Sequence, residues 1–456
     1  MTSSSTDVTV APADPTFRQR RRRAITSAWA GFAIDSYSIY VTSTALLPAM
    51  IYFEGNTSTA HASLVAGSTF AATLLGRPAG AVLFSSFADR ISRRKVGSIT
   101  IYGFGAMSLL IACLPGAQQV GVGVATGLLI ALRFIEGIFL GGEYTAATPM
   151  ALEYAPRSRR GLVGAIIQCS ASGGPFVVAV LTTVVLTFAP KGSLHSPYVQ
   201  WGWRISFVVG AILAALVAWF LRRRVEDSET WKTAERVKSP IREMLKGASG
   251  RAFIQVYCIM TGMFFAINML GSVMPQLLLS NKGYTASDLA HTQLVNPFPG
   301  IATYLFYGWL SDRIGRKPAL YIAGAVLVIG SPITLTLLGN GHLHSWAMLT
   351  LVASLTNVVI IGPLGVLPAY INERFSTAVR SSGWGIGYST AVIIPAFFSF
   401  YQAWLGHVMS FAHSAGLLAA LGGVILLVAA TQGPETRGIA LDAIGAPSGD
   451  PAGAAQ

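Results

Sequence analysis

The feature that most constrains this chain is a series of long stretches that are nearly free of charge. Twelve of them, separated by turn-forming or charged clusters, cover residues 24–52, 62–88, 96–115, 120–152, 161–188, 202–221, 252–279, 286–310, 318–339, 345–371, 381–404 and 408–430. About 20 apolar residues in a helix span the hydrocarbon layer of a bilayer. Only 11% of the residues are charged, against about 25% in soluble domains. We therefore predict an all-α membrane protein with twelve transmembrane helices.

Positive charge is distributed unevenly between the connections. Of the 32 lysines and arginines, two (Arg77 and Arg133) lie within the predicted spans and three (Lys191, Arg204 and Lys282) on the odd-numbered connections. Because Lys and Arg stay on the cytoplasmic side of short loops, both termini are predicted to be cytoplasmic, in a multi-pass protein of the cytoplasmic (inner) membrane. The basic cluster at 18–23 would face anionic lipid head groups, so the net charge of +13 does not indicate nucleic acid.

Two signatures recur at a constant spacing. FADRISRRK (87–95) and WLSDRIGRK (309–317) place Asp89 and Asp312 223 positions apart. LEYAPRSRRG contains Glu153 and Arg160, and INERFSTAVRSSG repeats this pair 220 positions later as Glu373 and Arg380. The repetition predicts two pseudo-symmetric six-helix bundles at 24–221 and 251–430. The polar stretch 222–250 is the expected cytoplasmic linker between them, flanked by an N-terminal segment (1–23) and a tail (431–456).

On these signatures the chain resembles the major facilitator superfamily over about residues 24–440. GRPAGAVLFSSFADR (76–90), RFIEGIFLGGEYTAATPMALEYAPRSRRG (133–161) and WGWRISF (201–207) are most similar to its metabolite:proton symporter branch. EYAPRSRRG and PETRG (434–438) also resemble the sugar porters. The resemblance implies a cytoplasmic gate whose charge networks close the inner side and break when the halves rock. Its expected members are Asp89, Arg90, Arg93, Glu153, Arg160, Asp312, Arg313, Arg316, Glu373 and Arg380.

Five charged residues fall inside the predicted spans of the first half: Asp35, Arg77, Arg133, Glu136 and Glu143. Counted at about 1.5 Å per residue from the cytoplasmic ends, three of them lie near the bilayer midplane and the remaining pair, Arg133 and Glu136, in the outer half. An isolated charge there costs at least about 2.5–3.5 kcal/mol, so each should face a partner or a wet cavity. Three acids against two bases leave one acid without a permanent partner, and we expect it to take up a proton near neutral pH.

The pairing of these charges is open at this point. Arg133 and Glu136 are three residues apart and can pair on one helical face. The family resemblance instead implies that Asp35 works with Arg133. The alternative is a set of static pairs that only fix helix packing, above all Glu143 with Arg77, since glycines 137 and 141 allow close approach. Arg77 could also bind a substrate carboxylate through two hydrogen bonds.

The interiors of spans seven to twelve contain no Asp, Glu, Lys or Arg, so proton coupling is expected in the first half. The candidate coupling residues are Asp35, Glu136, Glu143 and Arg133. The candidate substrate contacts are Arg77, Arg133, Tyr37, Gln168, Asn268, Asn296, Asn357 and Tyr388. Each neutral residue in this set could equally be a helix-packing residue.

These features predict a proton-coupled symporter that takes up a small organic acid or related metabolite by alternating access, because two intramembrane arginines suit an anion. Symport of a sugar or polyol with protons, and proton-coupled export, are the alternatives. A polytopic membrane enzyme would need a nucleophile, base or metal constellation that the sequence does not offer, and no GxxxxGK[ST] motif for an ATP-driven pump occurs. A receptor without transport activity would keep the same fold. No cofactor or metal is expected, the partners are substrate, protons and lipid, and a monomer should suffice.

Overall fold

The computed structural model describes residues 15–55, 59–227, 239–280, 294–339 and 345–441, together with Thr292 and Leu343. In the first half the main helices are α1 (Pro15–Val41), α3 (Thr59–Arg90), α4 (Arg93–Ala112), α6 (Val122–Glu153), α7 (Arg160–Phe188) and α8 (Trp203–Arg224). In the second half they are α11 (Gly247–Asn268), α12 (Met274–Ser280), α14 (Pro297–Ile314), α15 (Arg316–Gly339), α16 (Trp346–Ile361), α17 (Leu367–Asn372), α18 (Arg380–Thr390), α19 (Phe398–Leu405) and α20 (Phe411–Thr431). Three short helices, α2 (Ile51–Glu54), α5 (Ala117–Val120) and α10 (Pro240–Met244), complete the set. The predicted all-α class is confirmed.

The number of long helices agrees with twelve membrane spans. Within the described residues, ten helical segments are long and apolar enough to cross a bilayer, judged by length and composition. The remaining two are α1, which continues through a π-helical turn (Thr42–Leu46) and a 3-10 turn (Leu47–Ala49) into α2, and α14. They occupy the places of the predicted first and eighth spans. α1 begins within the segment expected to precede the first span, so its first turns carry the basic cluster at 18–23.

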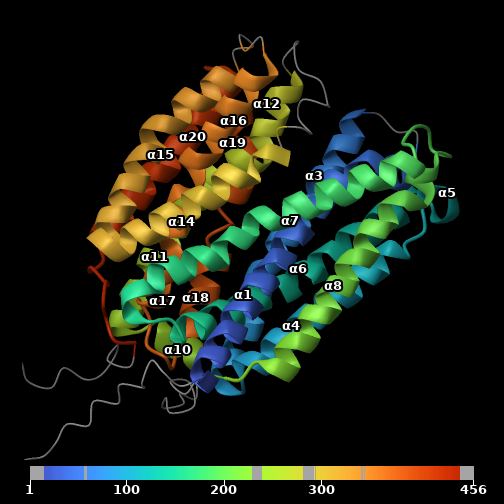
Figure 1. Ribbon diagram of the computed structural model, residues 1–456. Helices are drawn as coiled ribbons and strands as arrows, with labels where there is room; N and C mark the ends of the chain where they lie inside the picture. Colours follow the sequence, from blue (N-terminus) through green and yellow to red (C-terminus); the bar gives the residue numbers. More distant parts are fainter. Residues whose placement is uncertain are drawn as a thin grey trace, which may run out of the picture.

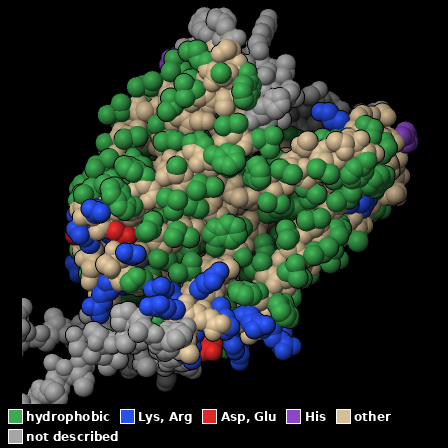
Figure 2. Space-filling model, viewed as in Figure 1, with side chains coloured by type: hydrophobic (Ala, Val, Ile, Leu, Met, Phe, Trp, Pro, Cys, Tyr) green, Lys and Arg blue, Asp and Glu red, His purple; other side chains and the backbone are tan. Residues whose placement is uncertain are grey.

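The helices form two bundles. In the first, α3 packs on α6, α1 on α7, and α4 on both α6 and α8; in the second, α15 packs on α20 and α16, and α11 on α20 and α18. Figure 1 shows that the bundles come together at the end where α10, α17 and α18 lie and diverge toward the other end. Lys and Arg side chains gather at the same lower end in Figure 2. We call it the basic end; it contains the junctions of α3 with α4 and of α14 with α15.

Glycines bring α3 and α6 into backbone contact. A Cβ added at Gly76 or Gly80 would overlap the α6 backbone, and one added at Gly137 or Gly141 would overlap the α3 backbone. Only residues without a side chain allow helix axes to approach so closely in a membrane, where packing replaces the hydrophobic effect between helices. The backbone carbonyl of Arg77 lies in this contact between α3 and α6, so the contact fixes the position of Arg77 along the axis of α6.

The second bundle contains interrupted spans that the sequence analysis did not predict. A 3-10 turn (Gly362–Gly365) separates α16 from α17, and turns followed by a 3-10 segment (Pro395–Phe397) separate α18 from α19. Proline has no N–H to continue the helical ladder, which explains the second interruption. Both spans remain long enough to cross the membrane.

We expect that Gly80→Ala lowers the stability of the folded protein by about 1–3 kcal/mol, because the new methyl group collides with the backbone of α6. Thermal unfolding of the purified protein in detergent measures this. Gly127→Ala on α6 is the matched control, since nothing lies within 4 Å of a Cβ at that position. Equal melting temperatures for the two variants would contradict the proposed backbone contact.

Candidate functional site

At the basic end, two aspartates each hold the first turn of a helix in the opposite bundle. Asp89, at the end of α3, accepts hydrogen bonds from the backbone N–H groups of Ser381 and Ser382 (3.2 and 2.8 Å) and from the Ser382 hydroxyl (2.8 Å). Asp312, at the end of α14, accepts from the N–H groups of Gly161 and Leu162, both at 2.8 Å. A carboxylate satisfies the free N–H groups of a helix N-terminus and complements its dipole. The two halves are therefore joined by reciprocal helix caps.

Two glutamates add ion pairs with the same symmetry. Glu153 pairs with Arg93 of its own bundle and with Arg380 of the other (2.5 Å). Glu373 correspondingly pairs with Arg316 of its own bundle (3.2 Å) and with Arg160 of the other (2.9 Å). These side chains are almost entirely buried, so each charge depends on its partner. The two copies of the repeated signature thus form two halves of a single network.

The C-terminal tail extends this network. The Thr436 hydroxyl donates to Glu373 (2.7 Å), while Arg160 and Arg380 donate to the carbonyls of Ile439 and Leu441, each at 3.2 Å. The PETRG motif was recognised as a family feature in the sequence, but its position in the gate was not predicted.

Glu435 in the tail caps α15. Its carboxylate accepts from the N–H groups of Arg316 (2.8 Å) and Lys317 (2.9 Å), as well as from two N–H groups of the tail itself. Burial raises the pKa of Glu435, but these four donors outweigh it and hold the pKa below its usual range. The cap is therefore fully formed above that usual range and weakens as the pH falls through the lowered pKa.

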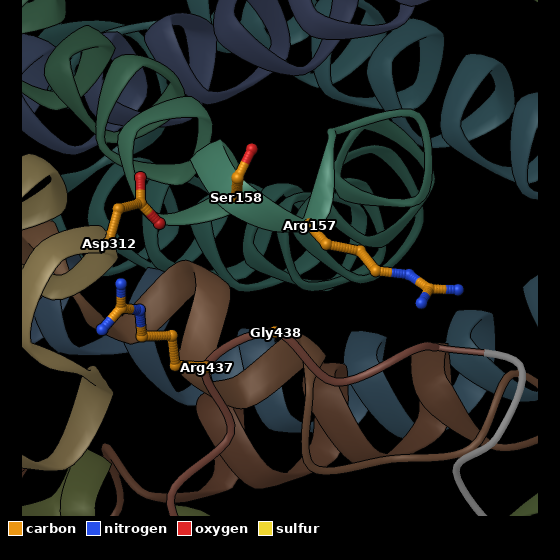
Figure 3. A pocket seen from close by; sticks show the side chains of 5 residues that line it. All are labelled: Arg157, Ser158, Asp312, Arg437 and Gly438. Atoms are coloured by element: carbon orange, nitrogen blue, oxygen red, sulfur yellow. The ribbon is translucent and has the colours of Figure 1, made fainter. Parts of the chain in front are cut away.

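A cavity of about 290 Å³ lies at the basic end between the halves and the tail, lined by Arg157, Ser158, Asp312, Arg437 and Gly438. Figure 3 shows Arg437 extending from the tail toward Asp312, while Arg157 extends away. The tail therefore closes over the contact between the bundles.

Two of the predicted gate residues lie outside the network. Arg90 and Arg313 are exposed, and the Arg313 guanidinium lies 5.2 Å from the ring centre of Trp309 on its own helix. Each arginine follows its aspartate by one residue, and one helical step rotates a side chain by about 100°, away from the opposite bundle. Their inclusion in the gate was wrong.

Near the middle of the first bundle, three charges form what we call the charged triad: Asp35, Arg77 and Glu143. Arg77 Nη2 lies 2.5 Å from Asp35 Oδ1, and both side chains are buried. Glu143 is 2% exposed and interacts electrostatically with both Asp35 and Arg77. Within the described part of the chain it forms no ion pair, and its Oε2 has no hydrogen-bond partner. Glu143 is thus the acid left over when three acids meet two bases.

The position of Glu143 depends on a glycine in α1. A Cβ added at Gly31 would overlap the Glu143 carboxyl group. Gly31 lies one turn from Asp35 on the same helix, so the two acids are held near each other by backbone as well as by side-chain packing. Like charges in a buried site favour protonation of one of them.

The triad lies on helix faces that approach the second bundle. Phe32 and Leu74, each three residues from a triad member on α1 and α3, belong to the same apolar cluster as Met263, Tyr304 and Trp384 of the second bundle. A site beside the triad would therefore be shared by both halves.

The other two intramembrane charges form a separate pair inside the first bundle. Arg133 Nη1 lies 2.5 Å from Glu136 Oε2, and both side chains are fully buried. Ser108 of α4 donates to Glu136 (2.8 Å), and Arg133 donates to the Ser38 carbonyl of α1 (3.2 Å). The expected pairs of Asp35 with Arg133 and of Glu143 with Arg77 are absent in this described region. Arg133 pairs with the acid three residues away on its own helix, which leaves Arg77 for Asp35.

Four of the neutral candidate residues form hydrogen bonds with other residues of their own bundle. The Tyr37 hydroxyl donates to the Ser206 carbonyl (2.6 Å) in the first bundle. The Asn268 amide donates to the Pro395 carbonyl, and the Asn357 amide to the Asn296 carbonyl, both at 2.9 Å in the second. Asn296 also accepts from Ser354 (3.1 Å). Buried polar groups bond to the nearest available partner. In this structure Tyr37, Asn268, Asn296 and Asn357 therefore bond to groups of their own bundle.

Gln168 and Tyr388 have a different location, near Tyr304 of α14. Tyr304 is buried, and its neighbours are Tyr40 of α1, Gln168 and Cys169 of α7, and Tyr388 of α18. This tyrosine cluster (Tyr40, Tyr304 and Tyr388) combines residues of both bundles and offers hydroxyl groups to a ligand. Tyr40 and Tyr304 are not among the residues predicted from the sequence; a tyrosine in the middle of an apolar span is the signal that could have found them.

Comparison with known proteins supports a transporter. The model of the Major Facilitator Superfamily matches residues 28–294, and that of the Sugar (and other) transporter family matches residues 226–446. The chain is 31% identical to the alpha-ketoglutarate permease of Escherichia coli (strain K12), over 82% of this chain and 84% of that protein. It is 27% identical to the shikimate transporter of the same organism, over 82% and 85%. A structure of the proton:xylose symporter XylE matches with a TM-score of 0.73 at 20% identity, over 93% of this chain and 98% of that chain, which shows a common fold.

We expect that Asp312→Asn opens the basic end, because the amide loses the ion pair with Arg316 and weakens the cap on α7. Hydrogen bonds to charged groups contribute about 1.5–3 kcal/mol, so the open population should rise roughly tenfold or more. Spin labels at the exposed positions Ser158 and Arg313, in a cysteine-free background, measure the distance between the bundles. Arg90→Gln is the control and should leave the distances unchanged. A wild-type distance distribution for Asp312→Asn would show that this cap does not hold the bundles together.

Proposed function

This chain belongs to the major facilitator superfamily, and on that premise we propose that it takes up a small organic acid together with protons by alternating access. It is a multi-pass membrane transporter and not an enzyme. The proposed moving units are the bundles 24–221 and 251–430, in a monomer of the inner membrane. The positive-inside rule assigns the basic end and both termini to the cytoplasm.

One observation carries the proton-coupling proposal: Glu143 is buried beside the Asp35–Arg77 pair and forms no ion pair among the described residues. With all three groups ionised, the charged triad has a net charge of −1. Burial of such a surplus charge is costly, so the neutral form of Glu143 is favoured. Uptake of one proton by Glu143 would bring the triad to neutrality.

The same arrangement explains how an anionic substrate would depend on the proton. A carboxylate that approaches an ionised triad meets net negative charge in a medium that screens poorly. Once a proton has neutralised one acid, Arg77 can share its donors with the substrate, since a guanidinium binds carboxylates through two hydrogen bonds. The tyrosine cluster of both bundles would supply neutral contacts nearby.

The proposed state of the gate follows from its geometry. The caps and ion pairs at the basic end are formed, and the bundles diverge toward the opposite end in Figure 1. With the basic end assigned to the cytoplasm, this arrangement corresponds to a transporter that is closed on the inside. Substrate and proton binding would favour release of the gate.

Symport of a sugar or polyol with protons is the second candidate. It is supported by the Sugar (and other) transporter model and by the fold shared with the proton:xylose symporter. A neutral substrate would need no guanidinium, which is why the organic acid is preferred. Proton-coupled export differs in that the substrate would leave in exchange for protons, whereas in symport the two move the same way.

We expect that Glu143→Gln abolishes accumulation driven by a pH gradient but retains exchange of labelled for unlabelled substrate. The amide is permanently neutral and imitates the protonated carboxyl group. Uptake and counterflow in proteoliposomes measure the two activities, and a loss of accumulation of about tenfold or more is expected. Glu243→Gln is the control, because Glu243 is exposed and pairs with the exposed Lys246.

Glu136→Gln is the comparison that distinguishes a role in proton coupling, proposed for Glu143, from a structural role of a buried acid. It leaves Arg133 fully buried without its counterion, which costs about 3–5 kcal/mol, so the yield of folded protein should fall. Undiminished pH-driven accumulation by Glu143→Gln would remove Glu143 from the coupling mechanism.

We expect that Arg77→Lys raises the KM for the organic acid by roughly tenfold, because an ammonium group cannot form the paired hydrogen bonds of a guanidinium. The substrate is first found by screening labelled organic acids against sugars in proteoliposomes with an imposed pH gradient. Alkalinisation of the outside on substrate addition supports symport, and acidification supports exchange. A sugar substrate whose KM is unaffected by Arg77→Lys would replace the organic-acid proposal by the second candidate.

A further inference from the structure

The interruption between α18 and α19 leaves backbone groups that need partners. Pro395 has no N–H and cannot donate to the carbonyl of Ala391, four residues earlier. Inside a membrane a free carbonyl cannot turn to water, so an interrupted span persists only where neighbouring side chains supply the missing hydrogen bonds.

Two side chains of α11 donate to carbonyls of this interruption: that of Ala391, which loses the N–H of residue 395, and that of Pro395, which also accepts from the N–H of Phe398. The Asn268 amide donates to the Pro395 carbonyl at 2.9 Å, and the Thr261 hydroxyl donates to the Ala391 carbonyl at 3.5 Å. The two donors are seven residues apart, which is two helical turns on one face, and their acceptors are the first residue after α18 and the first residue of the 3-10 segment that precedes α19. Both donors are buried, at 6% and 7% exposure. Together they hold the two parts of the eleventh span against α11.

The same seam contains a residue of the tyrosine cluster. The Phe264 ring, between the two donors on α11, meets the Tyr388 ring edge to face, with 5.3 Å between the ring centres. Tyr388 lies one turn before Ala391 and near Tyr304. Any shift of the interruption would therefore move Tyr388 relative to the first bundle.

The outer part of this span is held by apolar contacts and by one hydrogen bond of its own: Phe398 and Leu405 belong to the core cluster that includes α11, the Tyr401 ring lies 5.9 Å from that of Phe265, and the Tyr401 hydroxyl donates to the Ile394 carbonyl (3.1 Å). Phe400 and Trp404 of α19 are 71% and 73% exposed, as expected for side chains that face lipid. Among the main helices, α19 packs against α20.

We propose that Asn268 and Thr261 latch a proline hinge in the eleventh span and that this latch positions Tyr388 for substrate binding. The part that concerns the hinge rests on geometry alone. The part that concerns substrate rests on the proposed transport function. Asn268 is thus a positioning residue, which acts through Tyr388 without touching the substrate.

Hydrogen exchange of the purified protein, followed by mass spectrometry, tests the hinge without any substrate. Asn268→Leu removes the donor at similar volume and should accelerate amide exchange in residues 391–405 about fivefold. Asn357→Leu is the matched control: this buried amide also donates to a carbonyl at 2.9 Å, but between α16 and the start of α14. Its effect should stay outside 391–405. Unchanged exchange in 391–405 for Asn268→Leu would overturn the latch.

A double-mutant comparison tests the role of proline. Pro395→Ala restores an N–H at position 395, which can donate to the Ala391 carbonyl and make the Thr261 hydroxyl redundant. Thr261→Val should therefore accelerate exchange in the native background but not in the Pro395→Ala background. Thr356→Val is the control, since that hydroxyl bonds within its own helix. Equal effects of Thr261→Val in both backgrounds would contradict the assignment of Thr261.

Transport kinetics test the positioning of Tyr388. Asn268→Leu should raise KM about fivefold with a smaller change in kcat, and Tyr388→Phe should show little further increase when combined with it. Additive effects of the two substitutions would overturn the positioning role. If exchange in 391–405 accelerates but no organic acid is transported by the native protein, the hinge stands and the proposed substrate class fails.

Discussion

A polar group that this chain buries away from water within the membrane can find a partner only inside the protein, because lipid offers none. That constraint accounts for the main features of the structure. The aspartates at the basic end satisfy helix N-termini across the bundle interface, and Glu153 and Glu373 satisfy arginines from both bundles. The same requirement places the amide of Asn268 on the carbonyl of Pro395. Glu143 is notable because it is buried and yet forms no ion pair among the described residues.

The charged residues of the gate are equivalent in the two bundles, but the segments that cap and contact them are not. At the start of α15, Glu435 from the tail accepts the backbone N–H groups of Arg316 and Lys317. At the start of α4, Asp227 takes this role, accepting from the N–H of Arg94 (3.0 Å) and the hydroxyl of Ser92 (2.6 Å). In both cases an acid that follows the last helix of a bundle returns to cap the third span of that bundle. The tail continues onward to contact Arg160 and Arg380, which belong to different bundles.

The sequence predicted the features that depend on local composition and on repetition. Span length follows from apolar runs, and the gate partners follow from two signatures in which Asp89 and Asp312, or Glu153 and Glu373, occupy equivalent places. Which intramembrane charges pair could not be predicted in the same way. The contact of Asp35 with Arg77 depends on how α1 meets α3, and that approach is set by glycines spread over several helices. The family resemblance misled here, because Glu136 provides Arg133 with a partner on its own helix.

Neutral polar residues were the least predictable part of the site. An asparagine in an apolar span has the same appearance in sequence whether it contacts a ligand or satisfies a nearby carbonyl, and Asn268, Asn296 and Asn357 all do the latter. Tyr304 stands out as a tyrosine within an apolar span, but the sequence does not show that it meets residues of α1, α7 and α18. Interruptions such as the one at Pro395 are similarly decided by what a neighbouring helix can donate.

The backbone contact of α3 with α6 has a consequence for the motion of the charges. Arg77 lies on one of these helices and Glu143 on the other, and glycines leave no side chain between them that could change rotamer and let the helices slide. A rocking transition would carry both charges, with the closely packed Asp35, as a single rigid unit. Their separations would then be the same in either orientation, and what changes would be the access of water to them.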